Sequence, residues 1–373
     1  MKKRSSMTLT TTATAAVGLD VGDRFSHFCT LSQAGQVIAR GRIRTTPEAV
    51  QEQAQLWRGT RVALENGTHS GWISRILTAA GAETTVANPS RWRGTAHMSK
   101  NDRNDAEALA RVVRVDPALL FPIEHRSQAH QQDLATIRAR AALIKSRTQL
   151  INSARGLVKS LGARLPRADA AYFTAKTWPA VPAALRPALA PLYHALDALC
   201  QQIRTLDRHI DQLSQKRYPV TARLRSVPGV GPVTALTYVL TLADPHRFPR
   251  SRDAGAYLGL RPKQRQSGDR DPQLGIAKNG DRYLRSLLVE CAHHILSRGP
   301  DSALQRWGRA LAAGGRGVKR RALVGVARKL AVLLHRLWVS GDTFRPFPNQ
   351  PVREQTVDAE PRAHRSLAAT AAA

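Results

Sequence analysis

Cysteine, aromatic residues and long apolar runs are all scarce in this chain of 373 residues. The three cysteines, Cys29, Cys200 and Cys291, are far apart and form no C-x-x-C pair, which argues against a disulfide framework or a zinc ribbon and indicates a reducing compartment. Aromatic residues make up only 5%, which argues against a receptor lined with stacking platforms. No apolar run approaches the roughly 18–20 residues of a membrane span. We therefore expect a soluble, cytoplasmic protein.

Acidic residues are also scarce. The chain has 27 Asp and Glu and 57 Lys and Arg, which gives a formal net charge of +30. Hydrophobic residues make up 42%, so the sequence can fold and is no disordered polycation. Since so large a charge repels itself in a compact protein, a polyanionic partner is indicated. Nucleic acid, bound through phosphate neutralisation and counterion release, is favoured over an anionic membrane surface.

The first third of the chain predicts three meandering strands, followed by helices and strands in alternation (β-β-β-α-β-α-β-α). The expected strands are 16–21, 25–31, 36–44, 61–65 and 84–87, and the expected helices are 47–57, 70–80 and 102–115. This order is typical of an α/β domain of the ribonuclease-H-like class. A doubly wound nucleotide-binding fold is less favoured, because no G-x-G-x-x-G turn or helix follows the first strand.

The rest of the chain is predicted to be mainly helical. Apolar residues recur at spacings of three and four over 130–161 and 192–213, which predicts long amphipathic helices in either a coiled coil or a plain intramolecular bundle. An apolar helix is expected over 235–242 and a basic one over 316–339. The predicted divisions are a disordered N-terminus (1–14), the α/β domain (15–125), a helical coiled-coil region (126–218), a C-terminal domain (219–345) and a disordered tail (346–373).

Four carboxylates in the predicted α/β domain are candidate catalytic and metal-binding residues. Asp20 lies inside an apolar strand, where an unpartnered carboxylate is costly, and Glu65 ends the fourth strand. Asp102 and Asp105 share a face at the start of the last helix. If the first and fourth strands are neighbours beside that helix, the four acids converge and need a divalent cation, with Mg²⁺ or Mn²⁺ suited to oxygen ligands. Taken singly, Asp102 could instead be a helix-dipole charge and Glu65 a solvated strand end.

Two distal segments are candidates for nucleic-acid contact and chemistry. The stretch VPGVGPVTA, with Gly229 and Gly231, matches a helix-hairpin-helix turn whose backbone N–H groups can bind phosphate, although it could be a plain interhelical connection. Ser267 lies in a basic loop whose cations would stabilise a phosphate under attack, although Ser-Gly is more commonly just a turn. The candidate phosphate contacts, which could also be solvated charges, are Arg261, Lys263, Arg265, Arg270, Lys278, Arg282 and Arg285.

These motifs together resemble the IS110-family transposases, recombinases of insertion sequences with a RuvC-like DEDD domain. The matching pieces are VGLDV, ALENG, KNDRNDAEALA, SVPGVGPVTA, YLGLRPKQRQSG and LGIAKNGDRYLRSLL, and the resemblance spans roughly residues 15–340. Related DNA invertases share both domains, so transposition and inversion are not separated by these residues.

The resemblance implies more than the spacing does. It implies a RuvC-like domain with a metal bound by Asp20, Glu65, Asp102 and Asp105, a coiled-coil insert, and a C-terminal domain in which Ser267 is the nucleophile. It also implies cutting and rejoining of donor and target DNA by a homo-oligomer, a dimer or a tetramer, guided by an element-encoded bridge RNA.

We therefore expect a Mg²⁺-dependent DNA recombinase that associates with the nucleoid when bound to DNA and has no membrane partner. A RuvC-like structure-specific nuclease using the acids and water is an alternative. A non-catalytic DNA- or RNA-binding protein is a second alternative, for which the charge suffices but which leaves Asp20 unexplained.

Overall fold

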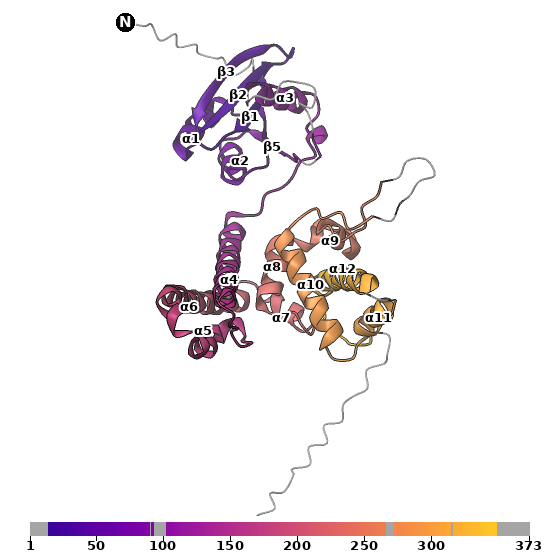
Figure 1. Ribbon diagram of the computed structural model, residues 1–373. Coiled ribbons are helices and arrows are strands. Elements are labelled where there is room, and N and C mark those ends of the chain that lie inside the picture. Colours follow the sequence, from indigo (N-terminus) through magenta and orange to yellow (C-terminus); the bar gives the residue numbers. More distant parts are fainter. Residues whose placement is uncertain are drawn as a thin grey trace, which may run out of the picture. The chain divides into compact units, whose positions relative to one another are not determined.

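The computed structural model describes residues 14–89, 91–92, 102–265, 272, 274–314 and 316–348. The chain forms two compact units that divide between Gln128 and Ala129 (Figure 1). The predicted α/β N-terminal unit and mainly helical C-terminal part are both confirmed.

The N-terminal unit is built on one mixed sheet of five strands in the order β3-β2-β1-β4-β5. The strands are β1 (Thr14–Val21), β2 (Phe25–Ser32), β3 (Val37–Arg44), β4 (Arg61–Glu65) and β5 (Glu83–Ala87). β1, β2 and β3 pair antiparallel as a meander, whereas β4 pairs parallel with both β1 and β5. The predicted meander and the predicted neighbours, β1 and β4, are therefore both observed.

Helices cover both faces of this sheet (Figure 1). The helices α1 (Pro47–Leu56) and α2 (Ser70–Ala79) pack with the odd-numbered apolar residues of β1, Val17 and Leu19. The opposite face carries α3 (Asp102–Val115), whose Leu109 and Val113 pack with small alanines of the strands. Successive strand residues point to opposite faces, so Ala16, Gly18 and Asp20 all belong to the α3 face.

One glycine allows α3 to lie directly on the sheet. A Cβ atom built on Gly18 would overlap the backbone of Ala106 and Ala110, and it would lie 2.9 Å from the Cβ of Leu109. All three residues are fully buried. The backbone of α3 therefore touches β1 at a position where no other residue fits, which fixes the height of the helix over the strand.

The second unit begins with an antiparallel pair of long helices, α4 (Gln128–Ser160) and α6 (Arg186–Lys216). Arg140 of α4 pairs with Asp207 of α6 at 2.5 Å, and farther along, Ile151 and Val158 pack with the early residues of α6. The hairpin thus packs within one chain, and nothing in its described contacts establishes a coiled coil.

The connection between these helices is more ordered than its Pro/Ala content predicts. It contains α5 (Phe173–Thr177) and several 3₁₀ turns, and α6 begins at Arg186, so that Pro191 lies inside the helix. The buried side chains Phe173, Leu189 and Tyr193 form a local core there. That packing offsets the backbone hydrogen bond that Pro191 removes near the helix start.

In the described residues that follow α6, the second unit is a bundle of six α-helices. They are α7 (Val220–Arg225), α8 (Pro232–Leu242), α9 (Ser251–Tyr257), α10 (Arg282–Ser297), α11 (Ala303–Ala312) and α12 (Arg316–Ser340). Every residue of α8 from Thr234 to Leu242 is buried, as expected for a helix that is apolar on all sides. Over the described part of the chain, none of the helices combines the length and apolar character that a bilayer crossing requires.

The contact at Gly18 predicts a large effect from the smallest substitution. Gly18→Ala should lower the free energy of unfolding of the N-terminal unit by about 2 kcal/mol or more. The new methyl group would overlap the backbone of α3, and this overlap is relieved only if α3 moves away from β1. Differential scanning calorimetry of the full chain measures the loss. Gly67→Ala is the matched control, since a Cβ there meets nothing within 4 Å. Equal melting temperatures for the two variants would show that α3 is not held this closely.

Candidate active site

Asp20 and Glu65 lie at the same edge of the sheet. β1 and β4 run parallel, with Gly18 beside Ala63 and Leu19 beside Leu64, so Asp20 and Glu65 follow as the next pair in this register. Ala16, Ala63 and α3 share one apolar cluster, which identifies the face of the sheet that Asp20 and Glu65 also share. The two carboxylates are therefore neighbours at the carboxyl ends of parallel strands, on the side of α3.

The third acid, Asp105, lies on α3 beside the contact with β1. Its neighbour Ala106 is the residue that meets Gly18, and Gly18 precedes Asp20 by two positions on the same face. The α3 axis runs antiparallel to β1 and β4, because the carbonyl of Arg114 near its end accepts from Arg61 at the start of β4. The first turn of α3 therefore lies at the end of the sheet where Asp20 and Glu65 lie.

The fourth acid, Asp102, is the first residue of α3. Its side chain lies outside the described residues, so the convergence of all four carboxylates stays a prediction. Considering only the side chains that the structure describes, no three of His, Cys, Asp and Glu lie close enough to hold a metal ion together.

A hollow of about 300 Å³ opens at this edge of the sheet. Asp20 and Glu65 line it, together with two residues that the sequence analysis did not select, Asp23 and His69. Trp72 Nε1 donates to His69 Nδ1 at 3.2 Å, which leaves the proton of a neutral His69 on Nε2, 3.4 Å from Asp23 Oδ1. The site thus holds a histidine of fixed tautomer. Asp23 comes two residues after the end of β1, and this position in the sequence is the signal that could have identified it.

His27 is a further residue that the sequence analysis did not select. It pairs directly with Asp20 across β1 and β2, so both residues lie on the α3 face. The predicted meander places these two strands side by side, but the turn residues between them do not specify the register, so the sequence pattern does not identify His27 as the partner of Asp20.

The donors present fit a hard divalent cation. Asp20 and Glu65 share one hollow. Asp105 Oδ1 is a buried carboxylate oxygen with no hydrogen-bonding partner among the residues that the structure describes. Buried oxygens of this kind are costly unless something positive lies against them. Oxygen ligands without sulfur suit Mg²⁺ or Mn²⁺ better than zinc.

Glu107, only two residues from Asp105, has a different environment. Partial burial raises its pKa, but hydrogen bonds from Arg111 and Arg40 outweigh burial and lower the pKa overall. Arg111 Nε lies 2.9 Å from Glu107 Oε1, and Arg40 pairs with Oε2. Glu107 is thus a structural acid that ties α3 to β3, whereas Asp105 lacks any such arginine among the described contacts.

The candidate serine lies in the second unit. Segments 259–263 and 274–278 pair as a short antiparallel ribbon, with Lys263 N to Gly275 O at 2.8 Å and Ala277 N to Arg261 O at 2.9 Å. Ser267 and Arg270 lie between these segments but outside the described residues. The ribbon holds together the two described segments that flank Ser267 in the sequence.

The described cations around this ribbon differ in their environment. Arg261, Lys263, Arg265, Lys278 and Arg282 are exposed. Arg285 instead donates to the carbonyl oxygens of Leu258, Asn279 and Gly280, at 3.0, 2.5 and 3.3 Å. These bonds give Arg285 a structural function at the end of the ribbon, and its role as a phosphate contact stays a prediction.

The Gly/Pro-rich turn joins α7 to α8, as the helix-hairpin-helix interpretation requires. Gly229 has φ +88°, and a Cβ on it would lie 2.8 Å from His294 Cδ2, so both conformation and space require glycine. Gly231 precedes α8, where a Cβ would meet nothing within 4 Å. An open position at a helix start is available for close approach by a phosphate.

Comparison with known proteins supplies independent information. Residues 17–162 match the profile of the DEDD domain of IS110 type, described as "Transposase", and residues 221–307 match the "Transposase IS116/IS110/IS902 family". The chain is 30% identical to the transposase for insertion sequence element IS1111A of Coxiella burnetii over 88% of this chain and 91% of that protein. It is 28% identical to the transposase for IS1328 of Yersinia enterocolitica, over 76% of this chain and 84% of that one. A putative transposase of Sinorhizobium fredii, y4pF/y4sB, is 31% identical over 78% of this chain and 76% of its own length.

The contrast between Asp105 and Glu107 predicts opposite effects on stability. Asp105→Asn should raise the free energy of unfolding in metal-free buffer by about 1 kcal/mol, because it removes a buried charge without a described partner. Glu107→Gln should lower it by about 1 kcal/mol, because the two half-exposed arginines lose their shared acid. Urea denaturation at pH 7 compares the two.

The pH dependence of the stability loss in Glu107→Gln is the control for this comparison. Because its folded pKa is depressed, Glu107 contributes stability at neutral pH that is lost as the pH falls below its ordinary value of 4.5. The deficit of Glu107→Gln should therefore shrink in acid. A destabilised Asp105→Asn variant would show that its carboxylate is satisfied in the folded protein.

Proposed function

This chain belongs to the IS110 family of insertion-sequence transposases, and we propose that it cuts and rejoins DNA with metal-bound acids and a serine nucleophile. The proposed catalytic and metal-binding acids are Asp20, Glu65, Asp102 and Asp105, in a ribonuclease-H-like N-terminal unit. The proposed nucleophile is Ser267 of the C-terminal unit. Donor and target DNA are the proposed substrates.

One observation carries the proposal. A parallel strand pair and a helix in backbone contact with it place Asp20, Glu65 and the start of α3 at the same end of the sheet. A fold that needed these acids only for solubility would not bury Asp105 Oδ1 or place Asp20 in an apolar strand.

DEDD transposases generally use divalent metal ions. In this chain Asp20 and Glu65 would hold the ion, with Asp105 and Asp102 completing an oxygen-only set, and we propose Mg²⁺ or Mn²⁺. When bound, such an ion stabilises negative charge on the reacting phosphate. The protein's own contribution is rigidity, because the sheet register and the contact at Gly18 hold the ligands in place before substrate arrives.

The proposed serine step conserves atoms and charge. The Oγ of Ser267 attacks a phosphodiester phosphorus, a bond from phosphorus to a sugar oxygen breaks, the serine proton is lost and the departing oxygen gains one. The seryl phosphodiester keeps the energy of the broken bond, so a second DNA strand can attack it and release the serine. Arg261, Lys263 and Arg265, which are exposed and precede Ser267 in the sequence, support phosphate binding near it.

The charge of +30 supports an additional nucleic-acid partner. We propose that this partner is an element-encoded bridge RNA that pairs with donor and target DNA, so that base pairing and not the protein reads most of the sequence. Two DNA segments must be cut and exchanged in one event, which favours a homo-oligomer, a dimer or a tetramer.

Loss of a single proposed ligand should abolish cleavage. Glu65→Gln should reduce strand cleavage by a factor on the order of 10³ or more while leaving folding intact, and EDTA should do the same to the unaltered protein. The assay is cleavage of a labelled donor DNA with the RNA and Mg²⁺ present. Glu48→Gln, which removes an exposed acid from α1, is the matched control and should cleave normally. Cleavage by Glu65→Gln at the level of Glu48→Gln would exclude Glu65 from the metal site.

The serine is tested by its covalent product. Ser267→Ala should abolish both strand joining and the protein–DNA adduct that survives denaturation, with DNA and RNA binding retained. Ser297→Ala, an exposed serine of α10, is the control. A nuclease that uses the acids and water would leave no adduct in the unaltered protein, so that result would favour the hydrolytic alternative over the recombinase.

A further inference from the structure

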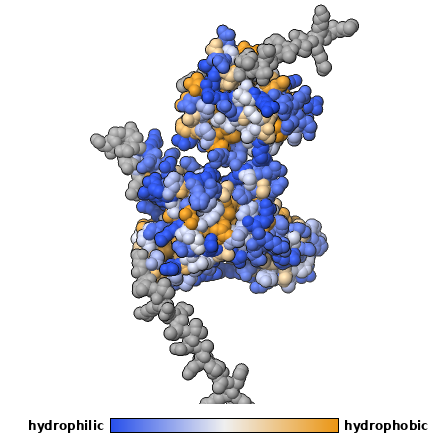
Figure 2. Space-filling model, turned by 180° about the vertical axis from the view of Figure 1, so that it is seen from behind, coloured by the Kyte–Doolittle hydropathy of each residue, from blue (hydrophilic) through white to orange (hydrophobic). Residues whose placement is uncertain are grey.

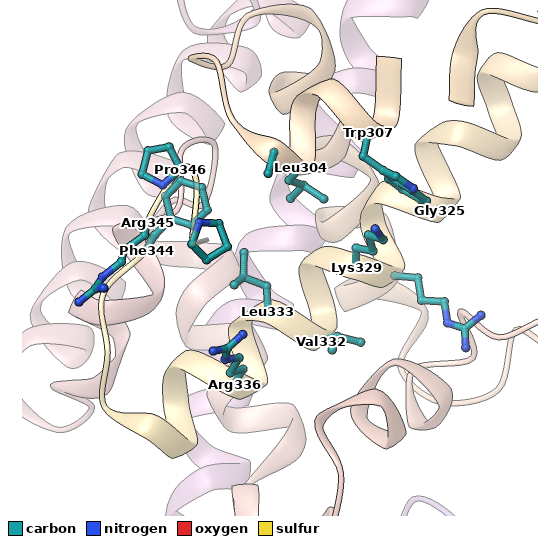
Figure 3. A pocket seen from close by; sticks show the side chains of 13 residues that line it. Leu304, Trp307, Gly325, Lys329, Val332, Leu333, Arg336, Phe344, Arg345 and Pro346 are labelled. Atoms are coloured by element: carbon teal, nitrogen blue, oxygen red, sulfur yellow. The ribbon is translucent and has the colours of Figure 1, made fainter. Parts of the chain in front are cut away.

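A hollow of about 620 Å³ lies between α11, α12 and the segment that follows α12, far in sequence from every candidate catalytic residue (Figure 3). Its size is in the range of small-ligand sites, roughly 300–1,000 Å³. Leu304, Val332 and Leu333 give it an apolar interior, and the aromatic residues Trp307 and Phe344 lie on opposite sides of it (Figure 3).

The aromatic wall is held in place by the packing around it. Gly325 of α12 leaves room for the indole, since a Cβ there would lie 3.2 Å from Trp307 Cη2. Lys329 Nζ lies 3.8 Å from the centre of the Trp307 ring. On the other side, the backbone N–H of Ala303 donates to Pro346 O at 2.9 Å, which ties the segment with Phe344 to the start of α11.

Charge around the hollow has one sign. The lining residues include the cations Arg328, Lys329, Arg336 and Arg345 and no described carboxylate. On the face shown in Figure 2, hydrophobic residues form small areas among hydrophilic ones. An apolar hollow ringed by cations is complementary to a ligand with a flat apolar part and several negative charges, which describes a nucleotide in a single strand.

We propose that this hollow binds one unpaired base of a single-stranded nucleic acid, with the flanking phosphates on Arg336 and Arg345. Apolar and aromatic walls accept any base, because every base has a π-face, and arginine forms paired hydrogen bonds with phosphate. Bases inside a duplex are stacked on one another and cannot enter. The site therefore selects unpaired segments such as loops. This inference rests on the proposed function only in that the chain binds nucleic acid.

The test compares a twelve-nucleotide oligothymidine strand with an abasic strand of the same length, by fluorescence anisotropy on the full chain at 150 mM salt. Stacking of one base predicts that the unaltered protein binds the oligothymidine about 10-fold more tightly than the abasic strand. The double variant R336Q/R345Q and the filling variant Ala303→Trp should each lose this difference. The control R320Q/R321Q removes two exposed charges from the same helix outside the hollow and should keep it. Melting curves of all variants confirm folding.

Each other outcome overturns the proposal in a recognisable way. Equal base discrimination in R336Q/R345Q, Ala303→Trp and the control would show that the bases are bound elsewhere and leave the proposed function standing. Displacement of oligothymidine from the unaltered protein by polyglutamate, abolished by Ala303→Trp, would identify an acidic peptide as the occupant. Binding of neither strand by the unaltered protein would remove this site, and it would leave standing the binding of donor and target DNA on which the proposed function depends.

Discussion

The backbone contact between α3 and β1 at Gly18 is the constraint on which the candidate site depends. It leaves no room for a side chain, and its neighbours on each element are the acids Asp20 and Asp105. Strand pairing then sets Glu65 beside Asp20 with no further adjustment. Clustered carboxylates repel one another, so they stay close together only if other parts of the fold hold them in position. A backbone contact and a sheet register are supports of that kind.

The charged residues of the second unit are mainly cations, and they fall into two groups. Some of its cations are committed to structure, as Arg285 is to three carbonyl oxygens, and Arg140 to Asp207. Others, such as Lys263 and Arg336, are exposed. The unit tolerates this positive charge because the packing of its hydrophobic core does not depend on the cations. The buried residues of α8 and the apolar faces of α10 and α12 form that core together with apolar residues of α4, α6, α7 and α9.

Most of the fold could be predicted from the sequence, because its signals are local. Alternating strands, Pro47 at a helix start and the glycine after the α2 segment each fix an element within a residue or two. The early start of α6 could not, since Pro191 argues against a helix and only the tertiary core at Phe173 and Tyr193 offsets it. The sequence pattern likewise did not identify His27 and His69. Each becomes a neighbour of the acids only through a strand register or a loop that the local pattern does not specify.

The central claim is that carboxylates held by β1, β4 and α3 form one cation site. Anomalous scattering from crystals of the full chain soaked in Mn²⁺ tests it most directly, since the anomalous peak locates the ion and thereby identifies the residues that bind it. The account predicts a manganese peak bound by the carboxylates of Asp20 and Glu65, with the start of α3 supplying the remaining protein oxygens. A saturating soak that leaves this edge of the sheet empty, or manganese bound by other residues while these carboxylates point away, would contradict it.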